Sequence, residues 1–70
     1  MNISVYELLD LFVDKSMLEI KVYNLHKDAE CIYSGCADDI PLEIEDMEIC
    51  SIDNIEKDGI LGINIDSSEI

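Results

Sequence analysis

The sequence is poor in positive charge and in the residues that build phosphate-binding loops. Its 70 residues include four lysines, one histidine, one proline, three glycines, no arginine and no tryptophan. Three scattered glycines cannot form a glycine-rich phosphate loop. A net charge of −13 repels nucleic acid and anionic lipid, so we expect neither of them as a direct partner.

Long apolar runs and an even set of cysteines are also missing. No run approaches the roughly 18 apolar residues of a membrane span, and acidic residues interrupt the apolar residues near the N-terminus, which predicts no signal peptide. Three cysteines cannot pair completely within one chain. We therefore expect reduced thiols and a cytoplasmic protein.

The chain does have enough apolar character to fold as a small domain. Hydrophobic residues make up 49% of it, which is too much for a disordered acidic tail. We expect residues 1–70 to form a single compact domain. Because a chain of this size buries only about 60% of its unfolded surface, oligomerisation would add stability.

Residues 1–13 predict a short amphipathic helix. Ser4 and Glu7 have the spacing of a capping box, in which the two side chains cap each other's backbone amides. A helix this short is not stable alone, so it must pack on the rest of the chain. Its apolar face follows the i, i+3, i+4, i+7 spacing and consists of Val5, Leu8, Leu9 and Phe12.

Four later segments show the two-residue alternation of strands. The first two are expected to form one hairpin and the last two a second hairpin. In the third segment, alternation places Ile49 and Ser51 on the same face. The predicted strands are residues 17–24, 30–34, 48–53 and 60–65.

The connection between the hairpins contains Pro41 and several acids. Alternation of Leu42 and Ile44 fits a strand, but a proline followed by acids favours a single helical turn over residues 41–46. The expected fold is α+β, in the order α-β-β-turn-β-β, with the helix on one face of a four-stranded antiparallel sheet. The other face would be the interface of a symmetric homodimer, formed by Tyr23, Ile32 and Ile60.

The groups that could carry catalysis or bind a metal are not expected to meet. His26 would lie in a hairpin loop and Cys31 within a strand, which disfavours a Cys–His catalytic pair. Cys31 and Cys36 lack the two-residue separation typical of zinc ligands. We predict a non-catalytic protein with no metal and no cofactor.

Acidic residues form the first candidate binding surface. Residues 38–58 contain nine carboxylates and one lysine. Along a loop and a sheet edge, these carboxylates would imitate a run of phosphates and occupy a basic groove on a nucleic-acid-binding protein. The same charges also suit a solvated face that only keeps the domain soluble. The candidate residues of this acidic face are Asp38, Asp39, Glu43, Glu45, Asp46 and Glu48.

Most of the positive charge forms a second candidate site. It falls within residues 15–27, close to two tyrosines. Lysines and tyrosines around a pocket would hold an anionic ligand that contains a ring. Ordinary decoration of a strand surface is the alternative. The candidate ligand-binding residues are Lys15, Lys21, Tyr23, His26, Lys27 and Tyr33.

The stretches 33–41, 48–53 and 59–65, together with the opening residues 5–9, resemble small acidic proteins of phages and prophages in Clostridia and related bacteria. The resemblance covers most of the chain but assigns no activity to particular residues. It implies an intracellular accessory protein. Phage proteins of this size often counter host defences, and they do so by binding.

Two modes of counter-defence fit the two candidate sites. A sponge, acting as a homo-oligomer, would sequester a nucleotide-derived immune signal at the lysine–tyrosine site, because short-range donors outweigh a field screened within about 8 Å. A decoy resembling an anti-CRISPR protein would bind a basic host protein through the acidic face, and the net charge favours it. The segregated lysines and the apolar second face make the sponge our leading hypothesis, with the decoy or a structural or regulatory phage module as alternatives.

Overall fold

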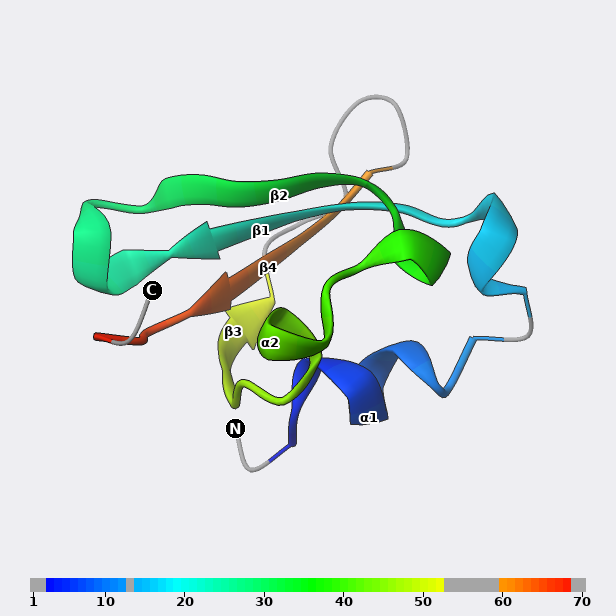
Figure 1. Cartoon of the computed structure of the whole chain (residues 1–70), viewed down its shortest axis with the longest axis horizontal. Helices are drawn as coiled ribbons and strands as arrows, with labels where there is room; N and C mark the ends of the chain where they lie inside the picture. Colours follow the sequence, from blue (N-terminus) through cyan, green and yellow to red (C-terminus); the bar gives the residue numbers. More distant parts are fainter. Residues whose placement is uncertain (1–2, 13, 53–59, 69–70) are drawn as a thin grey trace.

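The computed structural model describes residues 3–12, 14–52 and 60–68 of the chain (Figure 1). Within these ranges, two short α-helices, three single 3₁₀ turns and four strands follow one another, and the α+β class is confirmed. Among the described residues, no helix has the length and apolarity needed to cross a bilayer. The elements are α1 (Val5–Leu9), η1 (Lys15–Met17), β1 (Glu19–Asn24), η2 (Leu25–Lys27), β2 (Glu30–Cys36), η3 (Ala37–Asp39), α2 (Leu42–Glu45), β3 (Ile49–Ile52) and β4 (Leu61–Ile65).

The four strands form one mixed sheet in the order β2-β1-β4-β3. Both hairpins are antiparallel as predicted, β1 with β2 and β3 with β4. The central pair, β1 with β4, is parallel, so the prediction of an antiparallel sheet is wrong. The physical reason is the connection 37–48, which is long enough to cross from one edge of the sheet to the other instead of turning back beside β2.

Helix α1 begins as the capping box predicted. The Glu7 amide donates to the Ser4 hydroxyl, and the Ser4 amide donates to the Glu7 carboxylate, both at 3.1 Å. The helix is shorter than expected and ends at Leu9. Phe12 therefore lies beyond the helix, with 38% of its surface exposed, and is not part of the buried stripe.

The helical turn expected after Pro41 is present as α2. The Pro41 carbonyl accepts from the Ile44 and Glu45 amides, each at 3.1 Å, which closes the turn. Ile44 is buried, whereas Leu42 and Glu43 point to solvent. A single buried isoleucine thus holds an acidic helical turn against the core.

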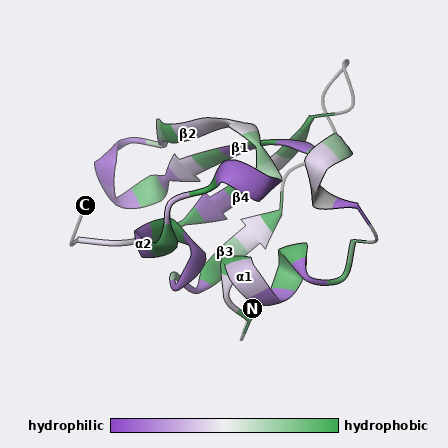
Figure 2. Cartoon of the chain, turned by 45° about the vertical axis from the view of Figure 1, so that its right-hand side comes forward, coloured by the Kyte–Doolittle hydropathy of each residue, from purple (hydrophilic) through white to green (hydrophobic). Residues whose placement is uncertain are grey.

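Both helices cover one face of the sheet (Figure 1). In β1, Ile20 and Val22 are buried on this face, while Lys21 and Tyr23 lie half-buried on the other face, which neither α1 nor α2 covers and which is called the open face below. Figure 2 shows hydrophobic and hydrophilic residues alternating along β1, whereas all five residues of β4 are buried. The core consists of Val5, Leu8, Leu9, Ile20, Val22, Ala37, Ile40, Ile44, Ile49, Leu61, Ile63 and Ile65.

Strand β3 is irregular. Ile49 pairs with Ile65 but Ser51 pairs with Asn64, so the register shifts between them. This β-bulge leaves Ile49 buried towards the core and puts Ser51 beside Asn64 on the open face, where the Asn64 amide donates to the Ser51 hydroxyl at 3.1 Å. The prediction that Ile49 and Ser51 share a face is therefore wrong. The turn predicted between β3 and β4 lies outside the described residues.

Candidate functional site

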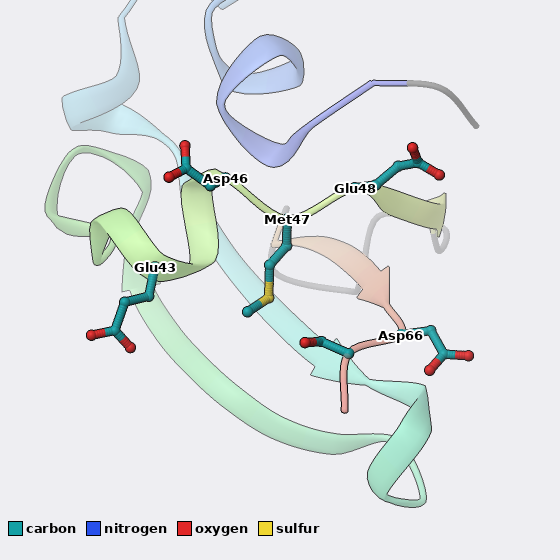
Figure 3. A pocket seen from close by; sticks show the side chains of 6 residues that line it. Glu43, Asp46, Met47, Glu48 and Asp66 are labelled. Atoms are coloured by element: carbon teal, nitrogen blue, oxygen red, sulfur yellow. The ribbon is translucent and has the colours of Figure 1, made fainter. Parts of the chain in front are cut away.

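A pocket of about 320 Å³ opens between the end of α2 and the segment that follows β4. We call it the acidic pocket. Figure 3 shows the Met47 side chain reaching into the space between α2 and Asp66, with the carboxylates spread around the opening rather than converging on one point. Its lining residues are Glu43, Asp46, Met47, Glu48, Asp66 and Ser67.

One wall of the pocket is the corner between α2 and β3, and the N-terminal segment holds this corner in place. The Val5 amide donates to the Met47 carbonyl, and the Ile49 amide donates to the Ile3 carbonyl, both at 2.9 Å. Between these bonds, Ser4 and Glu48 form an isolated antiparallel bridge. The start of the chain therefore fixes the backbone that carries two of the pocket's carboxylates.

The other wall is held by Asn24, which is fully buried at the end of β1. Its Oδ1 accepts from the Ser67 amide at 3.0 Å and from the His26 amide at 3.1 Å, and its Nδ2 donates to the Ser67 carbonyl at 2.9 Å. His26 Nδ1 lies 3.3 Å from Asp66 Oδ1. One buried side chain thus ties the segment after β4 to η2.

The pocket is strongly negative. Four of its six lining residues are acids, all four are exposed, and no lysine is among them. His26 lies beside Asp66 at the rim, where it can neutralise one carboxylate only when it is protonated. Among the described residues, no group of three or more His, Cys, Asp or Glu side chains is arranged to hold a metal ion. The arrangement therefore suits a cationic side chain or an extended basic surface.

The acidic face expected from the sequence is partly assembled here. Glu43, Asp46 and Glu48 line the pocket. Glu45 is half-buried on the same helical turn, and Asp38 and Asp39 are exposed on η3, one step earlier along the connection. The remaining acids of the span 38–58 fall within residues 53–59, outside the described residues.

The six residues of the lysine–tyrosine site are not brought together. Lys15 belongs to η1 and Lys27 to η2, which precede and follow β1 and so lie at its opposite ends (Figure 1). Lys21 and Tyr23 occupy the open face of β1 between them. His26 faces Asp66. The side chain of Lys15 is outside the described part of the chain.

Tyr33 has a structural environment. It packs against the core, and its hydroxyl donates to the Cys36 carbonyl. Partial burial, and then the nearby charges of Asp39 and Cys36, raise the pKa of Tyr33 above its usual value. A ligand at this position would have to compete with the existing hydrogen bond.

The three residues predicted for a dimer face also separate. Tyr23 is half-buried on the open face of β1, and Ile60 is half-buried just before β4. Ile32 instead packs against the core, because β2 carries an extra residue where its pairing with Val22 and Tyr23 shifts register. Ile32 therefore contributes to the core rather than to an open apolar face.

Sequence reasoning missed three residues of the acidic pocket and its support. The alternation predicts Asn24 only as the last residue of a strand, and no pattern in the sequence assigns a role to Asp66 or Ser67. Only the fold brings Asn24 next to Ser67, which is 43 residues away. None of the three cysteines, all of which lie within the described residues, forms a disulfide, and Cys31 donates weakly to the Tyr33 carbonyl at 3.4 Å.

Comparisons of this chain with protein-family models, with curated proteins and with solved structures find no match. The case for a function therefore rests on the pocket, its charges and the elements that hold it.

Proposed function

We propose that this chain is a non-catalytic binding protein that uses the acidic pocket and its rim to bind a basic protein. The observation that carries the proposal is a pocket with four carboxylates around an apolar methionine. Lysine and arginine pair an apolar stem with a charged head. Such a side chain would place its stem against Met47 and its head among the carboxylates.

The size and support of the pocket fit this role. Its volume of about 320 Å³ is at the lower end of known ligand pockets, which run from about 300 to 1,000 Å³. One wall is held by backbone bonds to the N-terminal segment and the other by buried Asn24. Because the pocket walls are already held in place, binding would cost less conformational entropy.

The resemblance to small acidic phage proteins suggests what the basic partner is. A nucleic-acid-binding host protein presents a groove of positive charge that normally contacts phosphates. Exposed carboxylates along η3, α2 and the pocket would occupy that groove and exclude nucleic acid. In this proposal the chain acts as an inhibitory decoy in counter-defence.

Sequestration of a nucleotide-derived signal has less support. Lys21 and Tyr23 do share the open face, but Lys15 and Lys27 stand at opposite ends of β1. Native mass spectrometry on protein purified from bacteria with triggered defence signalling tests it directly. A retained small molecule would favour the sponge over the decoy.

The decoy proposal is tested by measuring binding of a fluorescent lysine-rich peptide by anisotropy. The double variant Glu43→Gln/Glu48→Gln neutralises two pocket carboxylates without shortening either side chain. Each exposed ion pair contributes up to about 1 kcal/mol, so the affinity should fall roughly tenfold. Binding by the unchanged protein should also weaken as salt rises.

The matched control is Glu19→Gln/Glu30→Gln, which removes the same charge from exposed acids on β1 and β2, outside the pocket. Its affinity for the peptide should fall less than threefold, that is, by under about 0.7 kcal/mol. Equal losses in the two double variants would mean that only net charge matters. That outcome would reject the pocket as the binding site.

A further inference from the structure

Strand β2 lies at one edge of the sheet. It pairs with β1 on one side, and on its other side no strand of the described residues follows in the sheet. An edge strand presents unpaired backbone amides and carbonyls, which can pair with another chain. Natural proteins limit this by making edge strands short or irregular, or by placing lysine or proline on them.

The opposite edge shows such protection. β3 has four residues and contains the bulge at Cys50. The N-terminal segment covers its beginning through the bridge between Ser4 and Glu48. A second chain would find little regular backbone to pair with there.

Strand β2 also has a bulge, at Ile32, but it lacks the other kinds of protection. It has seven residues and includes neither lysine nor proline, and Glu30 at its beginning is its one charged residue. Residues 31–37 carry no charge in a chain in which 30% of residues are charged. An uncharged run of the same length, residues 59–65, contains the central strand β4. In its lack of charge β2 matches the central strand β4, although the other central strand, β1, contains Glu19 and Lys21.

We propose that the outer edge of β2, along residues 31–35, pairs antiparallel with the same edge of a second copy and joins two four-stranded sheets into one continuous sheet. Two chains of charge −13 repel each other, so they can approach closely only where charge is absent. The uncharged part of β2 provides such an edge. Antiparallel self-pairing is symmetric and closed, which limits the assembly to a dimer.

The ends of the strand also suit this arrangement. In an antiparallel pair, η2 of one copy approaches η3 of the other. Lys27 then lies towards Asp38 and Asp39 of the second copy. Asp28 and Glu30 lie at the same end as Lys27, so this contact offsets repulsion rather than creating net attraction. The backbone pairing of β2 supplies the stability.

The first test is sedimentation of the full chain under reducing conditions, over a range of protein concentration and salt. The unchanged protein should form a dimer whose dissociation constant falls as salt rises, because salt screens repulsion. Cys31→Lys places an edge lysine on β2, and Cys50→Lys makes the same change on β3; both cysteines are exposed. Cys31→Lys should weaken the dimer at least tenfold, and Cys50→Lys should leave it intact.

This comparison separates pairing from net charge. Both variants lower the negative charge equally, so a charge effect alone would strengthen both dimers. A monomer at all concentrations and salts, or equal behaviour of the two variants, would overturn the proposal. Chemical denaturation of both variants shows whether Cys31→Lys still folds.

The second test is hydrogen exchange at low and high protein concentration. Amides of residues 31–35 that point away from β1 should exchange more slowly as the dimer forms, in proportion to the fraction of monomer that remains. A dimer that protects only the open face, or only the pocket, would overturn the proposal even if dimerisation occurs. Protection of β2 that requires a strand from another protein would also overturn it.

Discussion

At the scale of single residues, Tyr33 and Gly35 form a small structural unit on β2. Gly35 has φ = +150°, a backbone conformation that residues other than glycine rarely adopt. A Cβ at this position would lie 3.4 Å from the Tyr33 hydroxyl oxygen. That distance is an ordinary van der Waals contact, so the positive φ rather than lack of space favours glycine beside the Tyr33 hydroxyl, which donates to the Cys36 carbonyl.

We predict that Tyr33 makes the protein less stable in alkaline solution. Folding raises the pKa of Tyr33, chiefly by burial. The unfolded chain then loses the phenolic proton at a lower pH than the folded chain. The contribution of Tyr33 to the free energy of unfolding is fully present below about pH 10, the ordinary tyrosine pKa. It is lost as the pH rises through the pKa of Tyr33 in the folded protein.

Urea denaturation from about pH 8 to pH 11, which spans the ordinary tyrosine pKa, measures this effect. Tyr33→Phe should cost about 1 kcal/mol at neutral pH through the lost hydrogen bond, and it should flatten the alkaline decline. Tyr6→Phe is the control, because Tyr6 is half exposed on α1. An alkaline decline that is unchanged in Tyr33→Phe would contradict the prediction.

The positions of the lysines show why the ligand-binding site could not be located from the sequence. Lys15, Lys21 and Lys27 are close along the chain, but β1 runs between the first and the last. An extended strand advances about 3.3 Å per residue, so closeness in sequence became separation in space. The acids of the connection stayed together because α2 is a compact turn.

At the scale of elements, strands, hairpins and the helix cap were predictable because they depend on local patterns. Alternation located β1 and β4, and the Ser4–Glu7 spacing located the start of α1. The orientation of one hairpin against the other depends on long-range packing. The connection 37–48 is long enough for a crossover, but its length does not require one, and it was predicted as a turn.

Two bulges also escaped prediction. Each inserts one residue into a strand and reverses which face the following side chains occupy. This moved Ile32 towards the core and placed Ser51 opposite to Ile49. Alternation alone assumes a regular strand and therefore fails at these positions.

We predict that Asn24→Ala detaches the segment after β4 and opens the acidic pocket. The change removes three hydrogen bonds and leaves the amides of Ser67 and His26 without that partner. Stability should fall by about 2–3 kcal/mol. Hydrogen exchange at the Ser67 amide should accelerate by more than the loss of global stability explains.

Asn64→Ala is the matched control. Asn64 is also buried, but it bonds to Ser51 on the open face, away from the pocket. Removing the Asn64 amide should lower the free energy of unfolding, but hydrogen exchange at the Ser67 amide should accelerate no more than that loss of stability explains. If Ser67 exchanges equally in both variants, Asn24 does not position the pocket wall.

At the scale of the whole molecule, the charge is much larger than a small fold can pair internally. The sequence has seventeen acidic residues and only four lysines, and the described residues pack into a radius of gyration of 11.0 Å.

The two proposed interactions, with a basic partner and with a second copy, respond to salt in opposite ways. Binding to a basic partner weakens with salt, whereas pairing of two acidic copies strengthens, so one titration distinguishes the two interactions.

The same repulsion acts within a single chain, and we predict that salt stabilises the folded monomer. Carboxylates are closer together in the compact state than in the expanded unfolded chain. Raising ionic strength from about 0.01 M to about 0.15 M shortens the Debye length from about 30 Å to about 8 Å. A gain of about 1 kcal/mol would raise Tm by roughly 4–8 °C.

Thermal unfolding followed by circular dichroism in sodium chloride measures this gain, at protein concentrations where the chain is monomeric. Glu43→Gln/Glu48→Gln should start from a higher Tm at low salt and gain less as salt is added, because two of the repelling charges are gone. A series in sucrose, which adds no ions and so does not screen charges, is the control.

A Tm that is flat or falling in sodium chloride would mean that attraction around the lysines and His26 outweighs repulsion among the acids. The acidic face would then be balanced within the fold and less available to a basic partner.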